Sequence, residues 1–130
     1  MSNTYFFYVC GLFFIALAFA TGHHLLYLVA AAYMLSNHWI GGKLMPYEGA
    51  WYSYFTLLDM AMACFLVIMF RSELIVLAAA ACVFGAVITL LAYKSDVVYQ
   101  HYGQWQLIPN ALFLVGMGLA PFLEAPFGLK

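Results

Sequence analysis

The 130-residue chain is too apolar for a water-soluble domain, because 68% of its residues are hydrophobic and only 7% are charged, against about 25% charged in an ordinary soluble protein. Four Lys and Arg residues stand against five Asp and Glu residues, so no basic patch exists for nucleic acid or anionic lipid. We therefore exclude nucleic-acid binding and expect an all-α transmembrane helical bundle, with residues 1–130 forming one integral domain in an inner or plasma membrane.

The first apolar run covers residues 5–40 and would be about 54 Å long as one helix, which exceeds one bilayer span at common tilts. The only plausible place for a break is Thr21-Gly22-His23-His24, so we predict that the helix ends there. The two resulting segments, 5–20 and 25–40, are shorter than the usual minimum of about 17 residues. They form either two short spans or a hairpin that enters and leaves on one side.

The next two apolar segments, residues 51–70 and 74–93, are long enough to span a bilayer. Only Arg71, Ser72 and Glu73 separate them. A turn this short predicts antiparallel neighbouring helices.

The last apolar segment, residues 107–122, follows a polar stretch at residues 94–106. Pro109 is expected in its first helical turn, where the missing N–H costs little. The chain is thus expected to contain five apolar segments, with four as the alternative count.

This topology places the N-terminus, residues 36–50 and residues 94–106 on one side of the membrane, which we call face A, and Arg71 and the C-terminus on the other. Basic residues occur on both sides, so the orientation stays open. Aromatic residues with polar tips concentrate on face A: Tyr5, Tyr8, Trp39, Tyr47, Trp51, Tyr52, Tyr54, Tyr93, Tyr99, Tyr102 and Trp105. Either face A is the functionally elaborated side, or its loops are simply longer.

Asp59 is the most informative residue, because it lies near the middle of an otherwise uncharged apolar segment. A charge at that depth costs about 2.5 to 3.5 kcal/mol on insertion scales and is usually retained for a function or paired inside a bundle. Tyr52 and Thr56 share its helix face, and Thr89 and Asn110 enter at similar depth. We predict that these five residues form an intramembrane polar cluster.

The predicted cluster has two interpretations. It is either the floor of a polar vestibule that binds an ion, a proton or a ligand, or a packing device in which a protonated Asp59 hydrogen-bonds Thr, Asn or another subunit. The packing interpretation is preferred, because one acid without a cationic partner at its depth makes a poor conduction path.

A second feature is a face of small residues on the segment 74–93. Small side chains allow two helix backbones to approach closely in a membrane. The predicted helix-packing residues are Ala78, Cys82, Gly85 and Ala86.

Metal and cofactor motifs are weak. His38 and His101 are the candidates for a haem ligand pair, because both are expected on face A, but no opposing histidine occurs in the later spans. We therefore expect neither a metal nor a cofactor.

No sequence motif identifies a reaction, and none of the usual hydrolase, metal or phosphate-loop signatures is present. We expect a non-enzymatic structural or regulatory subunit that acts through helix packing in the lipid bilayer, as a homo-oligomer or within a larger membrane complex. One alternative is a permeation element that uses Asp59: a small channel, an oligomeric transporter or a pore like a phage holin. Another is a haem-bearing anchor subunit of a redox complex.

Overall fold

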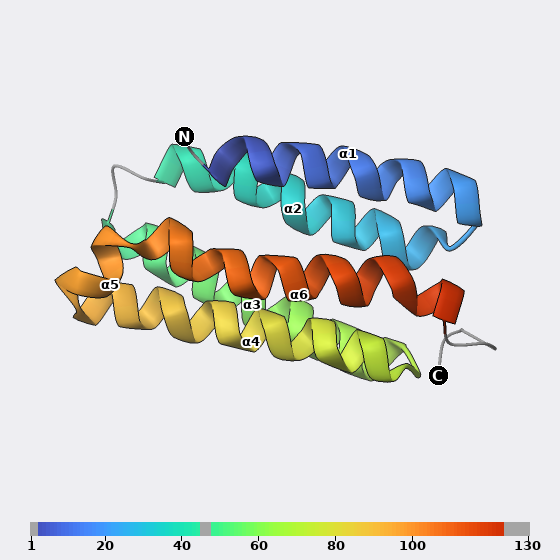
Figure 1. Ribbon diagram of the computed structural model, residues 1–130. Helices are drawn as coiled ribbons and strands as arrows, with labels where there is room; N and C mark the ends of the chain where they lie inside the picture. The colour runs from blue at the N-terminus through green and yellow to red at the C-terminus, as the bar shows by residue number, and fades with distance from the viewer. Residues whose placement is uncertain (1–2, 45–47, 124–130) are drawn as a thin grey trace. The chain divides into compact units, whose positions relative to one another are not determined.

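The computed structural model describes residues 3–44 and 48–123, and in these ranges the chain forms six α-helices and no strands (Figure 1). The all-α fold expected from the sequence is confirmed. The chain divides into two compact units, Met1–Trp51 and Tyr52–Lys130.

The first unit contains a helical hairpin of α1 (Asn3–Thr21) and α2 (His24–Leu44). The break falls where the polar interruption predicts it. Gly22 has a φ of +79°, a left-handed conformation that favours glycine. The Thr21 hydroxyl donates to the Leu17 carbonyl at 2.7 Å and accepts from the His23 N–H at 3.3 Å, which closes the end of α1.

Close packing joins the two helices of this hairpin. The rings of Phe14 and Tyr27 stack with their centroids 6.0 Å apart, and both side chains are fully buried. A Cβ atom on Gly11 would lie 2.6 Å from the Leu35 side chain, so a glycine is needed to let that side chain reach the α1 backbone. Phe14 contacts Tyr27, whereas Gly11, earlier in α1, meets Leu35, later in α2. The two helices are therefore antiparallel.

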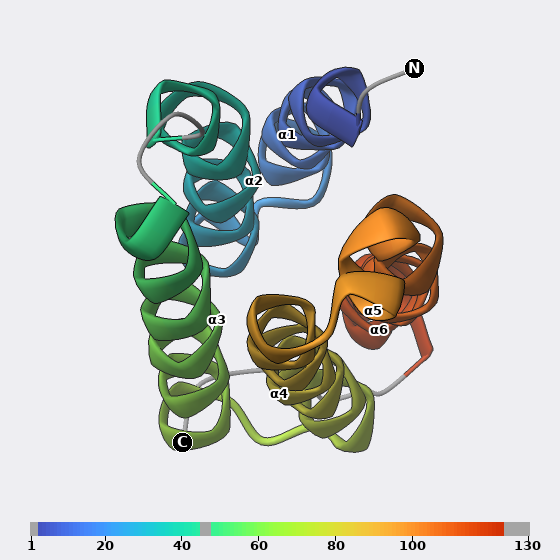
Figure 2. The same ribbon diagram turned by 90° about the vertical axis from the view of Figure 1, so that its left-hand side faces the viewer.

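The second unit contains α3 (Glu48–Met69), whose first residues precede Tyr52, followed by α4 (Glu73–Lys94), α5 (Asp96–Gln100) and α6 (Tyr102–Leu123). Figure 2 shows α4 flanked by α3 on one side and by α6 on the other. The Tyr52 ring meets the Tyr93 ring, and Asp59 lies beside Gly85. These contacts run in opposite directions along α3 and α4, which confirms the predicted antiparallel pair.

Both ends of α4 are well defined. The Ser72 hydroxyl accepts from the Ile75 N–H at 3.1 Å, and the Ser95 N–H donates to the Leu91 carbonyl at 2.8 Å. Glu73 lies in the first turn and Lys94 in the last, where each charge opposes the helix dipole. Residues 70–72 therefore connect α3 to α4, and Ser72 caps the start of α4.

The polar stretch before α6 departs from the prediction. It is largely helical, with α5 inside it and α6 beginning at Tyr102 rather than at residue 107. The physical reason is that Tyr102 and Gln106, one helical turn apart, both hydrogen-bond to α4. Pro109 consequently lies inside the helix and not in its first turn, and its missing N–H leaves the Trp105 carbonyl without the usual helical bond.

A glycine brings α6 against the backbone of α4. A Cβ atom on Gly116 would lie 2.6 Å from the Leu74 carbonyl oxygen and 3.2 Å from the Ala78 Cβ. No larger residue fits without moving one helix. Around Gly118, only two residues later, a Cβ atom would meet nothing within 4 Å.

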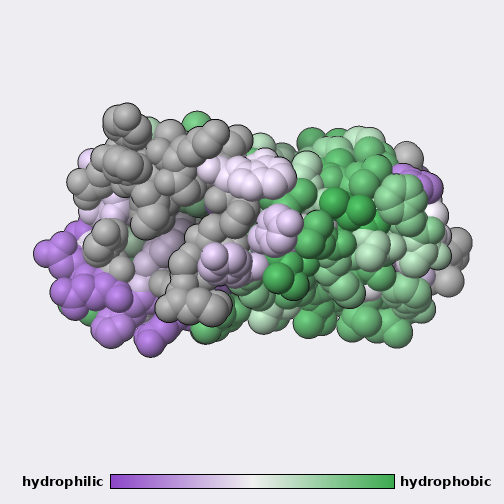
Figure 3. Space-filling view, turned by 90° about the horizontal axis from the view of Figure 1, so that it is seen from above, coloured by the Kyte–Doolittle hydropathy of each residue, from purple (hydrophilic) through white to green (hydrophobic). Residues whose placement is uncertain are grey.

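Three helices within the described residues are long and apolar enough to cross a membrane: Tyr52–Met69, Glu73–Lys94 and Gln104–Leu123. Tyr5–Thr21 is a shorter apolar helix. Of the five apolar segments expected, three are thus candidate spans and one is short, while a crossing by residues 25–40 stays a prediction. Figure 3 shows the hydrophilic side chains of the face in view gathered mainly toward one end, with most of the other half hydrophobic.

Gly116→Ala should destabilise the second unit by about 1 to 3 kcal/mol, the usual cost of overpacking, because its Cβ meets the backbone oxygen of Leu74. Unfolding in mixed detergent and sodium dodecyl sulfate micelles, followed by circular dichroism, measures the change. Gly118→Ala is the matched control and should be neutral or stabilising by up to about 1 kcal/mol. Equal destabilisation by both variants would show that helix flexibility, and not close packing, sets the requirement for glycine.

Arg71 and Lys94 should be reached from opposite sides of the membrane, because α4 separates them by about 33 Å and both side chains are exposed. Single cysteines at these positions, in a chain without Cys10, Cys64 and Cys82, can be labelled with an impermeant maleimide in sealed vesicles. Labelling of both from the same side would rule out α4 as a membrane span.

Candidate functional site

The polar side chains of the second unit converge on the backbone carbonyl of Gly85, in the middle of α4. The Thr89 hydroxyl donates to this carbonyl oxygen at 3.0 Å, and Gln106 Nε2 donates to it at 3.0 Å from α6. Thr89 is completely buried and Gln106 is 8% exposed. A hydrogen bond in this setting has no competition from bulk water, so the side chains tie α6 to α4.

Counting protons fixes the direction of the remaining bonds. Thr89 gives its only hydroxyl proton to Gly85, so the Tyr102 hydroxyl, 2.9 Å from Thr89 Oγ1, must donate to that oxygen. Tyr102 in turn accepts from Gln106 Nε2 at 3.0 Å. Burial raises the pKa of Tyr102 to about 12. The phenol therefore keeps the proton that this network requires.

Asp59 approaches the same glycine from α3. A Cβ atom on Gly85 would lie 3.2 Å from Asp59 Oδ2 and 3.3 Å from Gln106 Oε1. Only glycine leaves room for both oxygens without displacing them. Gly85 is thus the point where α3, α4 and α6 meet, and Asp59 is buried there, only 6% exposed.

The two oxygens beside Gly85 bear on the protonation state of Asp59. Gln106 Nε2 serves Gly85 and Tyr102, while its amide oxygen and Asp59 Oδ2 flank the same point beside Gly85. An amide oxygen and an ionised carboxylate are both acceptors and repel at close range. A proton on Asp59, or a cation beside it, would make the arrangement favourable.

Of the five predicted cluster residues, Thr89 and Asp59 join this site, Thr56 and Asn110 do not enter its hydrogen bonds, and Tyr52 packs against Tyr93. Thr89 is in the network, and Asp59 lies against it. Thr56 Oγ1 and Asn110 Nδ2 are buried, but neither has a hydrogen-bond partner within the described part of the chain. Tyr52 is also buried, and its ring packs edge-on against Tyr93 with centroids 4.9 Å apart.

Sequence reasoning missed Gln106 and the role of Tyr102. Gln106 was assigned to a polar loop, and Tyr102 only to the interfacial aromatic residues. Their spacing of four residues is the signal that could have identified them, because it places both on one helix face. Extending the last helix into the polar stretch would have turned that face toward α4.

The predicted helix-packing residues are all buried on α4: Ala78, Cys82, Gly85 and Ala86. Ala78 meets Gly116 of α6, and Gly85 meets Asp59 and Gln106. The second unit thus covers these small residues with its own helices.

The haem candidates gain no support from the site. His101 is exposed at the turn between α5 and α6, and the side chain of His38 lies outside the described residues. The described residues contain no group of three or more His, Cys, Asp or Glu side chains that could hold a metal ion. The haem interpretation therefore stays an untested prediction.

Comparisons with known proteins assign no family, because no protein-family model, curated protein or solved structure matches this chain.

Tyr102→Phe should destabilise the second unit by about 0.6 to 2 kcal/mol, the range for interhelical hydrogen bonds in membranes, because it removes the donor to Thr89 and the acceptor for Gln106. Tyr93→Phe is the control, since its ring contact with Tyr52 does not need the hydroxyl. It should change stability by less than about 0.5 kcal/mol. The same micelle unfolding assay measures both, and equal effects would show that the bonds of Tyr102 contribute nothing specific.

Proposed function

We propose that this chain is a small multi-span integral membrane protein that acts as a structural or regulatory subunit through helix packing within the bilayer. It performs no chemistry of its own in this proposal. The observation that carries the proposal is the site at Gly85. Buried polar groups from α4 and α6 hydrogen-bond to one another there, and Asp59 of α3 lies beside them.

Hydrogen bonding inside the unit supports a packing role for the polar residues. A solvated binding vestibule keeps its polar groups available for a ligand, whereas Thr89, Tyr102 and the Gln106 amide nitrogen use theirs on each other. A protonated Asp59 has the Gln106 amide oxygen as a nearby acceptor. The polar groups then fix the register of three helices.

Association with other chains, as a homo-oligomer or in a larger membrane complex, is part of the proposal. The low share of charged residues in the chain, 7%, supports it, because so apolar a chain has few polar groups to place in water.

A second candidate function is permeation of a proton or small cation. Thr56 Oγ1 and Asn110 Nδ2 favour it, because both atoms are buried without a hydrogen-bond partner in the described residues. Thr56 lies one turn from Asp59 on α3, and Asn110 lies one turn from Gln106 on α6. Unused polar atoms extending from an acidic residue could line a path.

Asp59→Asn separates the two functions. If Asp59 fixes packing, Asn keeps the shape and supplies an N–H donor for the Gln106 amide oxygen, so stability and molecular mass in detergent should barely change. Asp59→Leu should instead lose about 0.6 to 2 kcal/mol, because the donor disappears. Micelle unfolding and light scattering measure both variants.

The permeation alternative predicts a different pattern in proteoliposomes that contain a pH-sensitive or sodium-sensitive dye. A wild-type chain that conducts, together with an Asp59→Asn variant that folds and assembles normally but does not conduct, would overturn the packing proposal. No conduction by the wild type, combined with loss of stability only in Asp59→Leu, supports it.

A further inference from the structure

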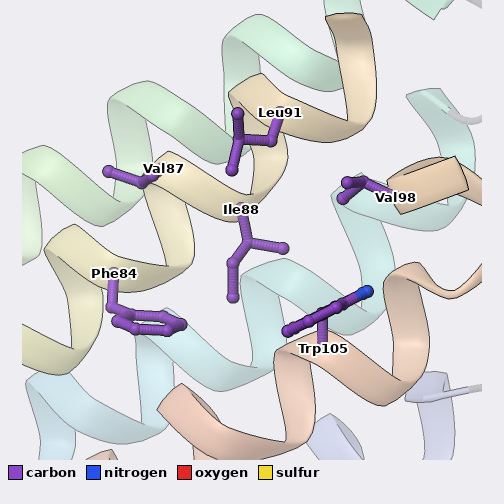
Figure 4. Close-up of a pocket in the computed structure, with 6 residues that line it drawn as sticks. All are labelled: Phe84, Val87, Ile88, Leu91, Val98 and Trp105. Atoms are coloured by element: carbon purple, nitrogen blue, oxygen red, sulfur yellow. The ribbon is translucent and has the colours of Figure 1, made fainter. Parts of the chain in front are cut away.

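A groove opens between α4 and α6 beside the short helix α5. It encloses about 170 Å³ and is lined only by apolar and aromatic side chains: Phe84, Val87, Ile88, Leu91, Val98 and Trp105. Figure 4 shows Phe84 at one end, Trp105 and Val98 at the other, and Ile88 between them. None of these residues takes part in the polar site at Gly85.

The groove opens outward rather than being a packing defect in the core. Ile88 is only 4% exposed and forms its floor, whereas Val87, Leu91 and Trp105 on its rim are 45 to 49% exposed. A cavity of similar size lined by Leu, Ile and Phe, about 150 Å³, stays dry and binds a hydrocarbon such as benzene. The groove is therefore suited to an apolar guest.

Its position identifies the source of that guest. From Leu91 to Phe84 the groove follows α4 for two turns, about 10 Å, and its walls belong to the candidate spans Glu73–Lys94 and Gln104–Leu123. At its other end lies Val98 on α5, outside the spans. An occupant would extend from the membrane boundary into the hydrocarbon region, as a lipid acyl chain does.

Charges at the boundary match a phospholipid headgroup. Lys94 lies one turn beyond Leu91 on α4, and Asp96 starts α5 two residues later; both are exposed. The Trp105 ring nitrogen points toward the Val98 end of the groove (Figure 4). A cation and an anion only two residues apart in the sequence complement a headgroup that carries a phosphate and an ammonium group, whereas a purely anionic headgroup would meet Asp96 unfavourably.

We propose that this groove binds one acyl chain of a zwitterionic membrane phospholipid, with its phosphate at Lys94 and its ammonium group at Asp96. The proposal is independent of the role of Asp59, because it uses the outer face of α4 and not the side that meets α3.

The test compares lipid retention by native mass spectrometry after reconstitution with equal amounts of phosphatidylethanolamine and phosphatidylglycerol. The wild-type chain should keep one phosphatidylethanolamine in preference to phosphatidylglycerol. Val87→Trp fills the groove and should reduce retention several-fold. Val83→Trp is the matched control, because Val83 is an exposed residue of α4 that does not line the groove, and it should retain lipid normally.

Two results would overturn the proposal: no retention of lipid by the folded wild-type chain, or an equal loss in Val83→Trp and Val87→Trp. The headgroup assignment is tested by Lys94→Gln combined with Asp96→Asn, which should abolish the preference for phosphatidylethanolamine; an unchanged preference contradicts it.

A second measurement leaves the groove unaltered, in case Val87→Trp does not fold. In a Trp39→Phe, Trp51→Phe chain, Trp105 is the only tryptophan. Its fluorescence should be quenched more by phosphatidylethanolamine with brominated acyl chains than by equally brominated phosphatidylglycerol. Equal quenching by the two lipids would mean ordinary bilayer contact and would refute a selective site.

Discussion

The missing side chain of Gly85 is the constraint on which the rest of the second unit depends. It exposes a backbone carbonyl that accepts from Thr89 and Gln106 and leaves space for the Asp59 carboxyl beside the Gln106 amide. In lipid, a buried polar group without a partner is costly. Placing these groups around one glycine lets α4 and α6 hydrogen-bond to each other beside Asp59 of α3, and it does so only when the helices are in one register.

The second close contact, between Gly116 and the backbone at Leu74, complements the first. The polar site lies toward the end of α4 that carries Lys94, whereas Leu74 lies near the other end. Together they hold α4 and α6 along much of their length, one through hydrogen bonds and the other through close packing, the two forces that replace the hydrophobic effect between membrane helices. The apolar groove lies between α4 and α6, outside these two contacts.

Much of this fold could be predicted from the sequence, because apolar length and short polar interruptions determine where membrane helices begin and end. The break at Gly22 and the α3–α4 turn followed directly from such signals. The start of α6 did not, because Gln106 and Tyr102 are polar residues in a polar stretch, and only their burial against α4 makes that stretch helical. Asp59 and Thr89 could be singled out by composition alone. Their meeting point could not, because it depends on the relative rotation of three helices, and Gly85 was interpreted only as a small packing residue.

Asp59 of α3 and Gln106 of α6 are expected to act together at Gly85, because both flank this glycine of α4. A double-mutant cycle in the micelle unfolding assay, with Asp59→Leu, Gln106→Leu and the double variant, measures their coupling. We expect a favourable coupling of about 0.6 to 1.7 kcal/mol, the range found for interhelical bonds in membranes. Strictly additive effects of the two substitutions would contradict it.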